Sequence, residues 1–249
     1  MNNTKAIFIK QLTSLLKVPS MIVQGILFLI IAAAFVFFFS PDEVHECDYC
    51  IPAYVCAPCE EEAYNRFQLP IPSGVGLFAV MFIGLALVGS ASALVLEDKT
   101  TTNLRFMAMA DVRPFQYLVG TVVSTIIVVA VMLIFYALLG GYLGANMFWF
   151  MAIGVTGGLV SILLGVVIAL SKVPLLATPI SLILGLGPTF GSQNETVANM
   201  LRFTFIQQVN IAIADLSADL TSNFLIIGAN GVVVLLLFVI MHRGNRFKL

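Results

Sequence analysis

Long apolar runs separated by short polar segments dominate the chain. A helix rises about 1.5 Å per residue, so a hydrocarbon layer of about 30 Å takes roughly 20 apolar residues. Six runs meet this requirement, although the fifth is short and contains three prolines, so we expect it to be kinked or partly re-entrant. The pattern therefore predicts six transmembrane helices, over residues 20–39, 74–96, 117–139, 147–171, 174–190 and 223–241.

Composition agrees with a chain that lies in lipid. Of the 249 residues, 60% are hydrophobic and only 10% are charged, and the formal net charge is −1. A soluble domain usually has about 25% charged residues, so this chain lacks the polar surface that a water-exposed globule needs. A soluble enzyme, a disordered chain and a nucleic-acid binder are excluded, the last because there is no basic excess. Continuous apolar runs also disfavour a β-barrel, whose strands alternate. The predicted fold class is an all-α membrane protein forming a single transmembrane domain over residues 1–249.

The lysines and arginines are distributed unevenly between the two sides of the predicted bundle. If the N-terminus is cytosolic, 10 of the 12 basic residues lie on the cytosolic side, and only Arg66 and Arg202 lie outside. Positive charge marks the cytosolic side of membrane proteins. We therefore expect a multi-pass protein of a bacterial cytoplasmic membrane with both termini in the cytosol.

The first 19 residues differ in kind from the spans. Apolar and basic residues alternate there with helical spacing, which predicts an amphipathic helix over residues 1–19 lying on the inner membrane surface among anionic lipids. Pro19 separates it from the first span. The alternative is a plain cytosolic extension of that span. The apolar side is formed by Phe8, Leu12, Leu15 and Leu16, and the polar side by Lys10, Ser14 and Lys17.

The six predicted spans contain no Asp, Glu, Lys, Arg or His. Proton-coupled transporters need such groups at depth, so their absence argues against coupling through carboxylates. There is also no phosphate-binding loop of the G-x-x-x-x-G-K-[ST] type, so the chain is not expected to hydrolyse ATP itself. Glycines spaced four apart, as at Gly154 and Gly158, allow close helix contacts, and packing within one bundle is favoured over a dimer interface.

A polar segment at residues 97–116 connects the second and third spans. Charged residues flank a short apolar patch that includes Leu104 and Phe106, and Pro114 ends it. A short helix with an exposed Met and Phe face is suited to docking into a groove of a partner protein. The alternative is an ordinary solvated hairpin.

This segment resembles the membrane subunits of ABC-2-type ABC transporters. In that family the second span ends in an acidic residue, followed by a Thr-containing step, a Leu and a turn with Pro before the third span. The resemblance extends over nearly the whole chain through the surface helix, the six spans and a long outer segment before the last span. Thr101 replaces the usual Gly of the pattern, and the matching residues are Glu97, Thr102, Leu104, Arg113 and Pro114.

The resemblance implies a permease subunit of an exporter, with no catalytic residue and no cofactor of its own. A second permease subunit, identical or different, would pair with it in the membrane lipid, and ATPase subunits holding ATP and magnesium would dock beneath. Residues 97–116 would form the coupling helix, and residues 191–222 would form short external helices that dip into the outer leaflet. Within that outer segment, apolar residues lie among polar ones in a pattern that fits an interfacial helix better than a hydrated loop, the apolar ones being Val209, Ile211, Ile213 and Leu216. The coupling residues carried over are Glu97, Asp98, Lys99, Thr102, Leu104, Phe106 and Arg113.

The resemblance suggests an amphipathic cargo moved outward, such as an antimicrobial peptide or a drug-like compound. An alternative within transport is a lipid-linked glycan, or a metal or cofactor. An alternative outside transport is a membrane sensor that binds its ligand through the outer loop at residues 40–73.

All four cysteines lie in that outer loop, as two C-x-x-C pairs. An even number of cysteines on an oxidising side favours disulfides, and one possible connectivity is nested. A tetrathiolate zinc site is the second interpretation, with His45 as a further possible ligand, and a redox-active pair is the third. The residues concerned are Cys47, Cys50, Cys56 and Cys59.

Overall fold

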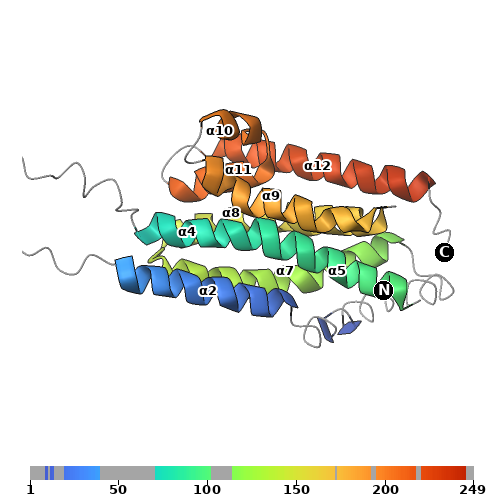
Figure 1. The fold of residues 1–249 in the computed structure, drawn as a ribbon, viewed down its shortest axis with the longest axis horizontal. Coiled ribbons are helices and arrows are strands. Elements are labelled where there is room, and N and C mark those ends of the chain that lie inside the picture. The colour runs from blue at the N-terminus through green and yellow to red at the C-terminus, as the bar shows by residue number, and fades with distance from the viewer. Residues whose placement is uncertain are drawn as a thin grey trace, which may run out of the picture.

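The regular elements of the computed structural model are helices, and no strand occurs among the residues that it describes. Figure 1 shows them as a bundle of roughly parallel rods. We call one end of the bundle the Asp98 end and the opposite end the Gly141 end, after residues that lie there. The structure describes residues 9–10, 12–13, 20–39, 71–101, 114–171, 173–191, 195–216 and 220–244.

Five helices are long and apolar enough to cross a membrane. The second of them is continuous from Ile71 to Thr100 and consists of α4, the short π-helix η1 and α5. This makes the protein an all-helical chain of multi-pass membrane type. The five are α2 (Ser20–Phe39), α4 (Ile71–Met81) with η1 (Phe82–Ala86) and α5 (Leu87–Thr100), α7 (Pro114–Leu139), α8 (Ala145–Leu170) and α12 (Thr221–Gly244).

The predicted fifth span is shorter than the others. Residues 174–190 form the 3-10 turn η2 (Pro174–Leu176) followed by the 15-residue helix α9 (Ala177–Gly191), which continues through Pro188. At about 1.5 Å per residue, α9 alone is about 22 Å long, less than a hydrocarbon layer. The structure therefore gives five helices long enough to span a membrane and two shorter apolar helices, over Pro174–Thr189 and Phe205–Ala214.

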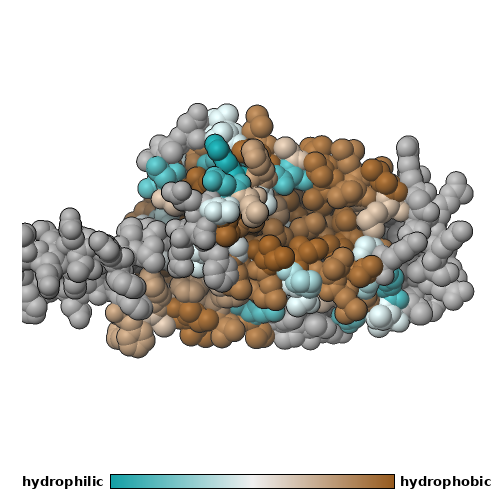
Figure 2. Space-filling view, turned by 45° about the horizontal axis from the view of Figure 1, so that its top comes forward, coloured by the Kyte–Doolittle hydropathy of each residue, from teal (hydrophilic) through white to brown (hydrophobic). Residues whose placement is uncertain are grey.

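The core lies where α5 and α8 pack together. The apolar stretches Gly74–Thr100 and Ala145–Leu170 are each 72% buried, whereas those of α2 and α12 are 17% and 11% buried. The outer helices therefore present apolar side chains to their surroundings, which Figure 2 shows as a largely hydrophobic surface. Such a surface requires lipid or another apolar partner.

Glycines of α8 allow its neighbours to approach closely. A Cβ atom added at Gly165 would lie 2.6 Å from the carbonyl oxygen of Val88 in α5, and one at Gly154 would lie 2.7 Å from Leu133 in α7. A side chain at Gly157 would meet Val209 at 2.6 Å. These contacts confirm the prediction that the small residues of this span pack within the bundle.

A tight turn joins α7 to α8 at the Gly141 end. Gly141 and Gly144 have φ values of 71° and 60°, a region that residues with a side chain rarely adopt. The turn folds Tyr142 back so that its ring stacks on Phe150 of α8, with ring centroids 4.7 Å apart. The Tyr142 ring is therefore buried as part of the core at the Gly141 end.

The long segment before α12 contains two helices, α10 (Glu195–Leu201) and α11 (Phe205–Ala214). Helix α11 is mostly buried and packs against α4, α8 and α12, with Val209 opposite Gly157 and Ile213 opposite Gly76. We had expected an interfacial helix whose apolar side includes Val209, Ile211 and Ile213. Only Ile211 of these three is exposed, so α11 is a component of the bundle.

Candidate functional site

Asp98 is a charged side chain that the bundle encloses. It lies in the last turn of α5 and is only 5% exposed. We had expected the second span to end at Leu96 and Asp98 to belong to a coupling loop. The helix continues four residues beyond that limit, to Thr100, so Asp98 lies on its last turn.

Two groups from other parts of the chain hold the Asp98 carboxylate. The Lys10 ammonium donates to Oδ1 at 2.6 Å, and the Tyr117 hydroxyl donates to Oδ2 at 2.9 Å. Each carboxylate oxygen therefore has a donor, which offsets the loss of water around a buried charge. Lys10 keeps its side chain 35% exposed, while Tyr117 is buried.

These contacts connect three segments at the Asp98 end. Lys10 belongs to the N-terminal region, Asp98 ends α5, and Tyr117 lies in the first turn of α7. Asp98 and Tyr117 lie on the two helices that flank residues 102–113 in the sequence. Their hydrogen bond therefore joins the segments on either side of these residues. We call Lys10, Asp98 and Tyr117 the Asp98 triad.

The residues next to Asp98 end the helix and face outward. The backbone N–H and hydroxyl of Thr101 and the hydroxyl of Thr100 all donate to the carbonyl oxygen of Glu97. The side chains of Glu97 and Lys99 are exposed. Of the three charged residues that the resemblance assigned to coupling at this helix end, two are therefore accessible to a partner and one is internal.

Several predicted sites lie outside the described residues, and their predictions stay untested. This holds for most of the proposed coupling helix, for most of the amphipathic N-terminal helix over residues 1–19, and for the entire cysteine cluster. The residues concerned are Thr102, Leu104, Phe106, Arg113, Cys47, Cys50, Cys56, Cys59 and His45.

Sequence reasoning did not assign the two partners of Asp98 to a site. Lys10 was interpreted as a residue facing lipid headgroups, and Tyr117 only as the start of the third span. Lys10 and Asp98 are 88 positions apart, so helical spacing gives no sign of their contact. The available signal was the acidic pair at 97–98 at the end of an otherwise apolar run, since an acid there needs a partner.

A second feature is a close crossing in the middle of the bundle. The π-helix Phe82–Ala86 interrupts the second span, and Gly84 within it lies against α9. A Cβ atom added at Gly84 would lie 2.7 Å from the Leu184 carbonyl oxygen, and one added at Gly185 would lie 2.5 Å from Leu85 Cβ. Two glycines thus bring the backbones together, at the type of irregularity that often marks functional positions in helices.

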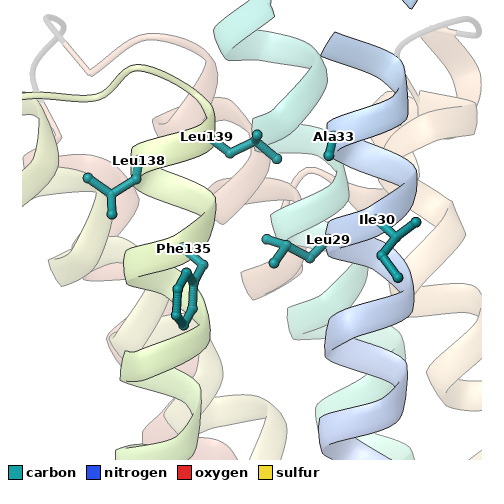
Figure 3. Close-up of a pocket in the computed structure, with 6 residues that line it drawn as sticks. All are labelled: Leu29, Ile30, Ala33, Phe135, Leu138 and Leu139. Carbon is teal, nitrogen blue, oxygen red and sulfur yellow. The ribbon is translucent and has the colours of Figure 1, made fainter. Parts of the chain in front are cut away.

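A third feature is an apolar pocket between α2 and α7, with a volume of about 310 Å³. It is lined by Leu29, Ile30 and Ala33 of α2 and by Phe135, Leu138 and Leu139 of α7, and Figure 3 shows Leu29 and Leu139 pointing toward each other across it. Ile30, Phe135 and Leu138 are also exposed on the outer surface of the bundle. The pocket has no charged side chain in its lining, so it can accept only apolar groups.

Comparison with known proteins gives no relative from which to transfer a function. No protein-family model matches the chain, and no curated protein and no solved structure is similar to it. The resemblance to ABC-2-type permeases therefore depends on the sequence pattern.

Proposed function

We propose that this chain is the membrane subunit of an ATP-driven ABC-2-type exporter. It works with a separate ATPase subunit and a second permease subunit in a bacterial cytoplasmic membrane. In this proposal the Asp98 end faces the cytosol together with both termini, and α9 acts as the short sixth span. The cargo is an amphipathic compound, such as an antimicrobial peptide, that moves outward.

The observation that carries the proposal is the Asp98 triad. A separate ATPase must transmit movement to the spans through a cytosolic element, and residues 102–113 offer one between α5 and α7. The Asp98–Tyr117 bond joins the bases of α5 and α7, and Lys10 adds the N-terminal segment. A force on the loop would therefore reach three segments together.

The exposed residues beside the triad support a docking surface. Glu97 and Lys99 present opposite charges on the last turn of α5, while Asp98 between them points inward. Charged groups at the rim of an interface steer association and set register. The apolar residues Leu104 and Phe106 would provide the buried centre of the contact.

The proposal is tested by co-purification of the intact chain from its native cells. We expect an ATP-binding-cassette ATPase to accompany the wild-type protein. Leu104→Asp or Phe106→Asp should reduce the recovered ATPase at least tenfold, because a charge at an apolar contact leaves its partner surface unsatisfied.

A matched control places the same charge on another connection at the same end. Leu175 lies in η2, is 85% exposed and is distant in sequence from residues 97–116. Leu175→Asp should leave the ATPase bound. Recovery of no ATPase with the wild-type chain, or equal recovery with Leu104→Asp and Leu175→Asp, would contradict the proposal.

A further inference from the structure

A cationic side chain lies at an unexpected depth along the bundle. Arg202 occupies the turn between α10 and α11, and its side chain is exposed. The distribution of basic residues predicted that Arg202 lies on the outer side, in a segment whose short helices dip into the outer leaflet. The contacts of the turn define its depth.

Neighbouring residues fix the depth of the turn. The Asn230 side chain donates to the carbonyl oxygen of Phe203 at 3.0 Å, and Asn230 lies near the middle of the 21-residue apolar stretch Thr221–Met241. Val209, about one helical turn into α11, lies against Gly157, near the middle of α8. The turn is therefore level with the central part of the spans.

The turn is also held in a defined shape. The side chain of Gln208, which is buried, donates to the carbonyl oxygen of Arg202, and Asn230 holds the next carbonyl. The hydroxyl of Thr204 accepts from the backbone N–H of Gln207 and begins α11. These bonds satisfy the backbone of the turn, as membrane depth requires, and leave the Arg202 side chain pointing outward.

The surroundings of Arg202 are those of a lipid-facing surface. Met200 and Phe203 on either side are 77% and 72% exposed. A guanidinium among such side chains needs an anion within reach of its long side chain. Within the part of the chain that the structure describes, no carboxylate pairs with it.

A polar stripe leads from Arg202 toward the Gly141 end. Thr196, Asn199 and Arg202 are spaced three residues apart along α10 and the turn, and all three are exposed. Residues three apart are neighbours on a helix surface, so Thr196 lies next to Asn199 on α10, and Arg202 follows three positions later in the turn. Figure 2 shows hydrophilic side chains in the region of α10 and α11, beside a broad hydrophobic surface.

We propose that Arg202 binds the phosphate of a membrane phospholipid, which is drawn below the headgroup plane along this polar stripe. The lipid belongs to the leaflet around the Gly141 end. Arginine binds phosphate through paired N–H donors, and arginine at depth is accommodated by snorkelling and local thinning of the bilayer.

A second copy of the chain is a less suitable source of the anion for Arg202 than a phospholipid. Among the described residues, the acidic ones lie at or beside helix ends, at Glu97, Asp98, Glu195 and Asp215. A neighbouring copy therefore has no carboxylate on these helices at the depth of Arg202. Phospholipid supplies the anion in this leaflet without a second protein.

The test uses the full chain in vesicles of phosphatidylethanolamine and phosphatidylglycerol. A trace of phosphatidylglycerol carries a photoactivatable diazirine in its headgroup, and cross-linked peptides are located by mass spectrometry. We expect cross-links within residues 196–203 of the wild type. Arg202→Gln should reduce them about fivefold, the effect of one basic residue on binding to anionic lipid.

Two variants make the result specific. Arg202→Lys keeps the positive charge and should retain most of the cross-links, and Lys99→Gln removes an exposed charge at the other end and should retain all of them. Equal labelling of wild type and Arg202→Gln would overturn the proposal. The proposal would also be overturned if the Phe203→Cys variant formed cross-links between two copies of the chain at position 203 and the lipid probe gave no labelling.

This experiment needs no ATPase and no cargo. Its failure would therefore leave the proposed export function untouched, and loss of the ATPase partner would leave the lipid site in place.

Discussion

The crossing between η1 and α9 allows a substitution whose effect follows from geometry. Gly84→Ala adds one methyl group at a position where the nearest atoms are all backbone. The new Cβ would lie 2.7 Å from the oxygen of Leu184, 2.8 Å from its carbonyl carbon and 2.9 Å from the nitrogen of Gly185. These atoms cannot rotate away as a side chain can, so the helices must separate.

The size of the effect can be worked from those distances. Ordinary contact between heavy atoms begins at about 3.5 Å, so the backbones must separate by roughly 0.8 Å at the crossing. Insertion of a methyl group into a packed core typically lowers the free energy of unfolding by about 1–3 kcal/mol. The higher helix propensity of Ala in a helix interior offsets part of this, by at most about 1 kcal/mol. We expect a net loss of about 1–2 kcal/mol.

Gly89→Ala is the matched control on the same span. A Cβ atom at Gly89 would meet nothing within 4 Å, so only the gain in helix propensity applies. Both variants are unfolded with increasing sodium dodecyl sulfate in mixed micelles, followed by far-ultraviolet circular dichroism. The midpoint should fall for Gly84→Ala and stay equal or rise for Gly89→Ala. Equal midpoints for the two variants would refute the close crossing.

Three further predictions concern other parts of the molecule. Asp98→Asn removes the charge that holds Lys10, and we expect the Lys10 amine of this variant to react faster with acetic anhydride and its unfolding free energy to fall by about 1–3 kcal/mol; a Lys10 reactivity equal to wild type would contradict the ion pair. Burial raises the pKa of Tyr142 to about 12 from 10.0. Because the unfolded chain loses that proton first, stability should decline as the pH rises from 10 toward 12, and Tyr142→Phe should lessen the decline in midpoint. For the cysteine loop, intact-mass measurement after alkylation without reductant should find no free thiol if disulfides form, or bound zinc with four thiols freed by a chelator; four free thiols without metal would exclude both interpretations.

The long spans were predictable because their signal is local. Helix α2 has the predicted bounds, Ser20–Phe39, and the other four long helices begin and end within a few residues of their predicted limits. A run of about 20 apolar residues has few alternatives in a membrane, since the backbone must satisfy its own hydrogen bonds.

Features that depend on distant partners were not predictable in the same way. The burial of Asp98 requires Lys10 and Tyr117, which helical spacing does not connect to it. Helix α11 contains Gln207 and Gln208, and the polarity of Gln208 was part of the pattern that indicated an interfacial position. In the folded chain both are buried, and Gln208 bonds to the carbonyl oxygen of Arg202. A polar side chain that meets a backbone carbonyl in the fold leaves no mark in the sequence.

The five-residue π-helix also sets the direction of everything that follows it in its span. Each residue turns an α-helix by about 100°, and a π-helical turn holds one residue more than an α-helical turn. If the same residues Phe82–Ala86 formed a regular α-helix, with none removed, the remainder of the span would be rotated by roughly that angle. Asp98 would then swing away from Lys10 and Tyr117, so the irregularity at mid-span is what aims a carboxylate about 20 Å further along the same rod.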